Sequence, residues 1–171
     1  RMMVDLHSLH VSQLPAYAPP DSEESQDPYR LVGGMTFSGD TGFGRMRFAS
    51  LAHLPLGKDK RAGIAEIVYY VEPSKDGTFV LRRSDRLEPF PPPEEKGGDP
   101  ILCENVKSLT FTFIDDEGEE QDRWDSESED FAFATPRAIR ISLVLGTDDF
   151  PHPFEATVAL MQYRNGVEIE K

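Results

Sequence analysis

Acidic side chains gather in residues 115–130 (DDEGEEQDRWDSESED), which contain ten Asp and Glu residues and one Arg. Carboxylate oxygens are the ligands that Ca²⁺ prefers. The candidate calcium ligands are Asp115, Asp116, Glu117, Glu119, Glu120 and Asp122. The spacing is not that of an EF-hand, because Gly118 would place Phe113 at the first ligand position. We favour a solvated acidic loop, since removing carboxylates from water is costly. A Ca²⁺ site and a docking surface for a basic partner are the alternatives.

Trp124 lies in the middle of this acidic segment, where a large indole is out of place in a fully solvated loop. We predict that it folds back to cover an edge of the core. Alternatively, its ring stacks on a sugar, which together with Ca²⁺ would make a carbohydrate-binding β-sandwich module.

Glycosidase chemistry needs two cooperating carboxylates. Glu66 and Glu72 lie too far apart on one predicted strand to act together.

The remaining motifs do not assemble a catalytic or cofactor site. His7 and His10 share one face of a predicted helix, but no recognisable further metal ligand accompanies them. Residues 39–44 (GDTGFG) contain a single Asp-Thr-Gly, typical of aspartic proteases, and lack the Lys of a P-loop. Cys103 lies in an apolar run and is expected to be a small buried hydrophobe. We therefore predict that the protein is not an enzyme and needs no cofactor.

The net charge of the chain argues against two classes of binding partner. The chain has 18 Lys and Arg against 31 Asp and Glu, a net charge of −13. Phosphate backbones and anionic membrane surfaces would repel it, which argues against binding nucleic acid or an anionic membrane surface. No apolar stretch approaches the roughly 20 residues that span a bilayer.

The 13 Gly and 14 Pro indicate many turns between short elements, which favours β structure.

Apolar residues follow a helical period only at the start of the chain. Residues 1–14 predict a helix that ends before Pro15 and is followed by an acidic, Pro-rich loop over residues 15–28. The helix has no N-cap residue of its own, so we expect it to be the end of a longer helix. Its apolar stripe is the predicted partner interface, formed by Met2, Met3, Leu6 and Leu9.

Alternating apolar and polar residues predict antiparallel strands in the rest of the chain. The expected strands cover residues 29–37, 45–48, 64–72, 78–84, 106–114, 137–146 and 154–163. In residues 106–114, Leu109, Phe111 and Phe113 share the predicted core face. Residues 89–100 are Pro-rich and predict an exposed excursion. The predicted fold class is α+β, with one N-terminal helix packed on antiparallel sheets of about six or seven strands.

The order of these features resembles one protein family. The sequence runs through IVYYV (67–71), TFVLRR (78–83) followed by Asp85, ILCENVKSLTF (101–111), Trp124 and PRAIRI (136–141). This order is similar to that in the periplasmic part of the J-type minor pseudopilins of type II secretion systems. The resemblance covers about residues 64–146.

The resemblance implies a division into residues 1–14, the end of a pilin-type N-terminal helix, and residues 15–171, a periplasmic β-rich domain. It implies a cleaved, methylated prepilin leader and a long apolar helix anchored in the inner membrane. The implied partners are the I-type and K-type minor pseudopilins at the pseudopilus tip, where the subunit starts filament assembly for protein export. The minor pilins of type IV pili share this plan and are an alternative, as is the carbohydrate-binding module.

Overall fold

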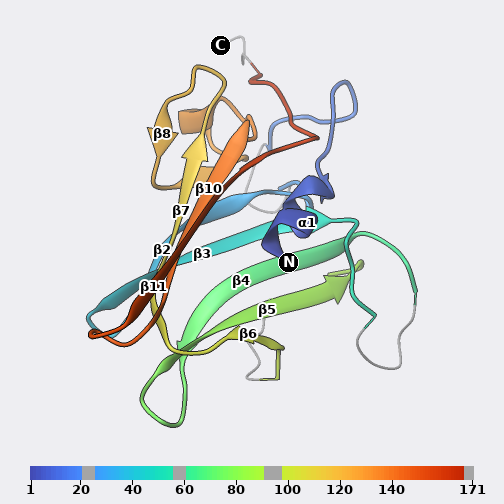
Figure 1. The fold of residues 1–171 in the computed structure, drawn as a ribbon. Coiled ribbons are helices and arrows are strands. Elements are labelled where there is room, and N and C mark those ends of the chain that lie inside the picture. The colour runs from blue at the N-terminus through green and yellow to red at the C-terminus, as the bar shows by residue number, and fades with distance from the viewer. Residues whose placement is uncertain (21–25, 56–60, 91–97, 168–171) are drawn as a thin grey trace.

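The structure, a computed structural model, describes residues 1–20, 26–55, 61–90 and 98–167. Among these residues, 47% lie in strands and 6% in helices. The strands form two antiparallel sheets, one of seven strands and one of four (Figure 1). The predicted α+β class is therefore wrong. The described part of the chain is mostly β, with one short N-terminal α-helix and one 3₁₀ helix at Glu129–Phe131.

The larger sheet has the strand order β6-β5-β4-β3-β2-β9, and β1 also pairs with β3. Its strands are β1 (Leu9–His10), β2 (Val32–Ser38), β3 (Thr41–Ser50), β4 (Ala65–Pro73), β5 (Phe79–Leu87), β6 (Ile101–Cys103) and β9 (Trp124–Asp125). The strands expected over residues 64–72 and 78–84 are confirmed as β4 and β5, which pair with each other as an antiparallel hairpin. Gly77, in the turn between them, has a φ of +76°, which glycine adopts without steric cost.

The smaller sheet has the strand order β11-β10-β7-β8. Its strands are β7 (Val106–Ile114), β8 (Glu120–Gln121), β10 (Ala138–Gly146) and β11 (Pro151–Ala159). The predicted core face of β7 is confirmed, because Leu109, Phe111 and Phe113 are all buried. The strand expected over residues 154–163 is β11 in the structure. Val158 is buried, but Phe154 is 56% exposed because β11 is the edge strand.

The N-terminal helix α1 (Met2–His7) is much shorter than the helix predicted over residues 1–14. Ser50 Oγ donates hydrogen bonds to the backbone carbonyls of Asp5 and Ser8, at 2.8 and 3.2 Å. A continuing helix would use these same carbonyls for its own next turn. The chain leaves the helix here and pairs as β1 with β3. Leu9 of β1, which the helical spacing had placed in the apolar stripe, is buried.

The two sheets pack face to face where β7 lies against β3. Gly44 in β3 makes this approach possible. A Cβ atom there would lie 2.9 Å from Phe111 Cδ2 and 3.0 Å from the Leu109 carbonyl oxygen. The hydrophobic core lies between the sheets and includes Leu6 of α1. Figure 1 shows the sheets diverging away from this contact, with α1 on the open side.

The described residues contain more strands than the six or seven predicted. The additional strands β1, β6, β8 and β9 have only two or three residues each. Such strands are too short to show an alternating pattern. Parts of the predicted loops 15–28 and 89–100 lie outside the described residues.

Candidate functional site

The four side chains predicted to form a partner interface do not share one surface. Leu6 and Leu9 are 0% and 1% exposed and belong to the core. Met2 is half-buried against that core, and Met3 is 49% exposed. Met2 and Met3 are therefore the two members of this set that a partner can reach.

Buried charged and polar side chains hold α1 on the larger sheet. We call them the Asp5 cluster: Asp5, His53, Tyr69, Arg83 and Asp85. Arg83 Nε donates to Asp5 Oδ2 at 2.7 Å, and the Tyr69 hydroxyl donates to the same carboxylate. Asp5 is 0% exposed and Arg83 2%. Burial raises the pKa of the Tyr69 phenol, and the negative charge of Asp5 raises it further.

The Asp5 cluster extends along β5 to Asp85. Arg83 Nη1 donates to Asp85 Oδ2 at 2.5 Å, and His53 Nδ1 lies 2.5 Å from Asp85 Oδ1. Arg1 Nη2 lies 2.5 Å from Asp5 Oδ1, so a second arginine also pairs with the Asp5 carboxylate. Both carboxylates are therefore held by cations, which is the arrangement of a structural ion-pair network. A general base would need a carboxylate oxygen open to a substrate proton.

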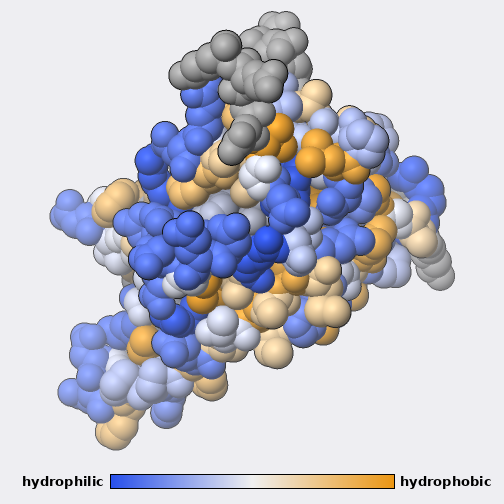
Figure 2. All heavy atoms as spheres, turned by 90° about the horizontal axis from the view of Figure 1, so that it is seen from above, coloured by the Kyte–Doolittle hydropathy of each residue, from blue (hydrophilic) through white to orange (hydrophobic). Residues whose placement is uncertain are grey.

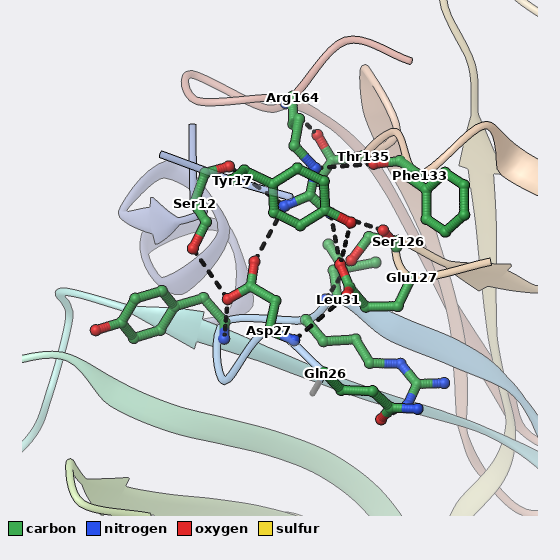
Figure 3. Close-up of polar contacts among 12 residues, drawn as sticks. Ser12, Tyr17, Gln26, Asp27, Leu31, Ser126, Glu127, Phe133, Thr135 and Arg164 are labelled. Carbon is green, nitrogen blue, oxygen red and sulfur yellow. Dashed lines mark hydrogen bonds and ion pairs between the residues drawn. The ribbon is translucent and has the colours of Figure 1, made fainter. Parts of the chain in front are cut away.

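A second buried group involves the segment that follows α1 (Figure 3). We call it the Arg164 cluster: Ser12, Tyr17, Asp27, Glu127 and Arg164. Arg164 Nη1 donates to Asp27 Oδ2 at 3.1 Å, and Nη2 donates to Glu127 Oε1 at 2.8 Å. The Arg164 guanidinium carbon lies 3.4 Å from the centroid of the Tyr17 ring. Two carboxylates thus share one guanidinium that is only 2% exposed.

Neutral donors complete the Arg164 cluster. The Tyr17 hydroxyl donates to Glu127 Oε1 at 2.8 Å, and Ser12 Oγ donates to Asp27 Oδ1 at 2.9 Å. The guanidinium also donates to the backbone carbonyls of Ser12, Ser126 and Phe133. Burial and the hydrogen bond to Glu127 raise the pKa of Tyr17. The cluster therefore fastens the segment after α1 to the loop before β10 and to the C-terminal segment.

The six predicted calcium ligands do not converge. The Glu120 carboxylate accepts two hydrogen bonds from Arg140, at 2.8 and 2.9 Å, and these lower the pKa of the Glu120 carboxyl. Asp115 Oδ1 accepts the backbone N–H groups of Glu117 and Glu119. The other four are exposed: Asp116, Glu117, Glu119 and Asp122. Among the described residues, no group of three or more His, Cys, Asp or Glu is arranged to hold a metal ion. The Ca²⁺ site stays a prediction.

Trp124 folds back onto the core, as predicted, and is 3% exposed. Its ring stacks on Phe131 with 4.4 Å between centroids, and its Nε1 donates to the Ala134 carbonyl at 2.9 Å. A sugar would need an exposed ring face for stacking. Phe131 covers one face of the indole, so Trp124 is not placed as a sugar platform.

An apolar groove opens between the two sheets on the side of β6 and β11. It has a volume of about 520 Å³ and lies at the N-terminal end of α1. Its lining includes Met2, Met3, Leu81, Leu102, Ile141 and Phe154. By contrast, Figure 2 shows the molecule from above as mostly hydrophilic, with hydrophobic residues in small separate patches. The groove is a candidate binding surface because large apolar surfaces seldom stay in water without a partner.

No family model matches the chain, and no curated protein is significantly similar to it in sequence. Helices of the length and apolarity needed to cross a membrane do not occur in the described parts of the chain. The fold and the two buried clusters define the class of this molecule: a two-sheet antiparallel β domain whose short N-terminal helix is fixed by ion pairs.

Proposed function

We propose that the chain is a structural subunit and not an enzyme: a J-type minor pseudopilin of the type II secretion system. The subunit joins the I-type and K-type minor pseudopilins at the pseudopilus tip, starts filament assembly and supports protein export. The β domain lies in the periplasm, and an N-terminal membrane helix anchors the protein in the inner membrane.

The residues that carry the family resemblance support this proposal through their position in the fold. Residues 67–71 lie in β4, residues 78–83 begin β5, residues 106–111 begin β7, and residues 136–141 lead into β10. These four strands contribute to both sheets and to the core between them. The resemblance therefore covers the structural centre of the domain and not only its loops.

The observation that carries the proposal is the way α1 is attached. One side of α1 is fixed to the larger sheet by the buried pair of Asp5 and Arg83. Met3 and Val4 are 49% and 53% exposed. A subunit of a filament built on N-terminal helices must hold its domain at a fixed angle to its helix. It must also leave part of that helix free for a neighbour. The attachment of α1 meets both requirements.

Two alternatives are separated by experiment. A minor pilin of a type IV pilus has the same plan but different partners and a different phenotype. The Ca²⁺-assisted carbohydrate-binding module stays a prediction that the buried position of Trp124 does not favour. Calorimetric titration with Ca²⁺ and with a glycan panel tests that module, and heat in both titrations would support it over the pseudopilin.

Deletion of the gene in its native host tests the proposed function. We expect exported proteins to accumulate in the periplasm and wild-type complementation to restore secretion. Met3→Glu should fail to restore it, because a carboxylate would enter the exposed side of α1. Met35→Glu is the matched control, since Met35 is similarly exposed, at 46% against 49%, but lies in β2.

Unchanged secretion in the deletion strain would contradict the proposal, provided that deletion of the secretin gene blocks export in the same host. Loss of pilus-dependent motility with normal secretion would assign the protein to a type IV pilus instead.

A further inference from the structure

Asn165 and Gly166 form the only Asn-Gly pair in the sequence. They follow β11 in a segment where both residues are exposed and neither belongs to a helix or a strand. Glycine has no Cβ atom to shield its backbone nitrogen, so this nitrogen can approach the side chain of the residue before it. The side-chain amide of Asn165 is therefore open to attack by the next peptide nitrogen.

The Gly166 nitrogen is free to act as the nucleophile. Within the described part of the chain, its N–H donates no hydrogen bond. The residues on either side are bonded: the Arg164 N–H donates to Thr135 Oγ1 at 2.7 Å, and the Val167 N–H donates to the Ala132 carbonyl at 2.8 Å. The two residues between them can therefore change their dihedral angles while the ends of the segment stay attached.

Arg137 bonds to the atom on which negative charge would develop during this attack. Its Nη2 donates to Asn165 Oδ1 at 2.9 Å. The guanidinium is also placed over the Tyr163 ring, with its carbon 3.6 Å from the ring centroid. When Gly166 N adds to Asn165 Cγ, the electron pair of the C=O bond moves to Oδ1. A cation bonded to that oxygen stabilises the adduct, so Arg137 favours the reaction.

Water is the only other reactant that this chemistry needs. A bond forms between Gly166 N and Asn165 Cγ, and the bond between Cγ and Nδ2 breaks. The leaving nitrogen takes the proton of the Gly166 N–H and departs as ammonia. A water molecule then opens the cyclic imide at either of its carbonyls. The products are an aspartate side chain or its isoaspartate isomer, in which the main chain runs through the side-chain carbons.

We infer that Asn165 is a site of self-modification, at which Gly166 and Arg137 convert the asparagine into a mixture of isoaspartate and aspartate. The reaction involves no partner, so the inference is independent of the proposed function. An isoaspartate lengthens the main chain between Arg164 and Val167, both of which are bonded to the domain. The modification therefore loosens the attachment of the C-terminal segment beside the Arg164 cluster.

Peptide mapping by mass spectrometry measures the reaction. The full folded chain is incubated at mildly alkaline pH and sampled over time. We expect the peptide that contains residue 165 to become heavier by about 1 Da and to separate into two products on chromatography. Asn105, the only other asparagine, is the internal control, because the next residue is the buried, β-branched Val106. Its peptide should stay unmodified while half of Asn165 is converted.

Variants of the chain test the role of Arg137. Arg137→Met should slow the loss of ammonia by about fivefold, as expected for the loss of one hydrogen bond. Arg137→Gln keeps a donor but removes the charge, and its rate should be intermediate. Arg140→Met is the matched control, since Arg140 bonds to Glu120 and not to Asn165. Circular dichroism verifies that each variant is folded.

Unfolding the chain in urea separates the effect of the fold from that of the local sequence. The wild type and Arg137→Met should lose ammonia at the same rate in urea, because the contact between Arg137 and Asn165 is then absent. A difference between them that persists in urea would overturn the inference.

Two further outcomes would also overturn it. These are equal rates for the folded wild type and both Arg137 variants, and modification of Asn105 as fast as that of Asn165. If Arg137→Met does not fold, the comparison of the wild type with Arg137→Gln decides. If folded Arg137→Met slows the reaction while deletion of the gene leaves secretion unchanged, the proposed function fails and the modification site stands.

Discussion

Asp5 of α1 and Arg83 of β5 form a buried ion pair that joins two segments 78 residues apart in the sequence. Two hydrogen bonds connect them, from Arg83 Nε to Asp5 Oδ2 at 2.7 Å and from Nη2 to Oδ1 at 3.2 Å. A helix of six residues is too short to be stable alone in water. This pair, together with the burial of Leu6, therefore determines where α1 lies on the domain.

Removal of Arg83 should be more damaging than removal of Asp5. Arg83→Met leaves both Asp5 and Asp85 without the guanidinium that holds them, and breaking such a buried pair costs about 3–5 kcal/mol of unfolding free energy. Asp5→Ala leaves Arg83 paired with Asp85, so its cost should be smaller. Urea unfolding at neutral pH measures both values.

A surface ion pair supplies the control for this comparison. Lys107 Nζ lies 2.5 Å from Asp148 Oδ1, and the Asp148 side chain is 95% exposed. Asp148→Ala should change the unfolding free energy by less than about 0.5 kcal/mol. An effect of Arg83→Met as small as that of Asp148→Ala would show that the Asp5 cluster does not stabilise the domain.

Replacement of Arg164 should destabilise the domain strongly. Arg164→Met leaves the carboxylates of Asp27 and Glu127 buried without their common cation, with side chains 4% and 1% exposed. We expect a loss of about 3–5 kcal/mol in chemical unfolding. Arg164→Lys should recover little, because an ammonium group cannot reproduce the planar fork of donors.

Arg123 provides the matched arginine control for Arg164. Its side chain is 70% exposed and pairs with Asp130 at 3.2 Å. Arg123→Met should therefore cost less than about 0.5 kcal/mol. Similar losses for Arg164→Met and Arg123→Met would contradict the role given to the Arg164 cluster.

The domain should lose stability in alkaline solution. Burial raises the pKa of Tyr17 and Tyr69 in the folded state above the unfolded value of about 10. Above that pH the unfolded chain loses these protons while the folded chain keeps them. The free energy of unfolding therefore falls as pH rises, by up to about 1.4 kcal/mol per pH unit for each tyrosine. Below that pH these groups contribute no pH dependence.

Urea unfolding at several alkaline pH values, carried out on single Tyr→Phe variants, measures this effect. Tyr69→Phe and Tyr17→Phe should each flatten the decline of stability with pH. Tyr163→Phe, which changes a 42% exposed side chain, is the control. An unchanged slope in both Tyr69→Phe and Tyr17→Phe would refute the linkage.

Gly44 should not tolerate a larger residue. A Cβ atom there would lie 2.9 Å from the ring of Phe111 and 3.0 Å from a backbone oxygen of β7, so Gly44→Ala must push the two sheets apart. Overpacking of this kind costs about 1–3 kcal/mol. Gly98→Ala is the control, because nothing lies within 4 Å of its Cβ position. Thermal unfolding compares the two, and equal midpoints would contradict the close contact.

Strand β7 was predictable from sequence because it buries one face. The alternation of Leu109, Phe111 and Phe113 identified β7, and the patterns in residues 64–72 and 78–84 identified β4 and β5. The length of the helix was not predictable. A period of 3.6 residues accounts for Met2, Leu6 and Leu9, but Ser50 bonds to the carbonyls that a longer helix would need.

The sequence predicts the Asp5 cluster and the Arg164 cluster only in part. Asp5 falls in the apolar stripe of the helix, between Met2 and Leu9 in helical spacing, which predicts a buried partner for its charge. The identity of that partner depends on tertiary structure, since Arg83 is 78 residues away. Arg164 follows the last predicted strand, and the sequence around it does not predict that its side chain is buried. Its partners lie 137 and 37 residues distant.

Co-expression of the full chain with the I-type and K-type minor pseudopilins encoded in the same genome tests the proposed role most directly. Native mass spectrometry of the purified material reports which subunits associate. We predict a complex that contains all three proteins and that is lost with Met3→Glu but kept with Met35→Glu. A chain that remains monomeric beside an assembled pair of the other two subunits would contradict the assignment as a minor pseudopilin.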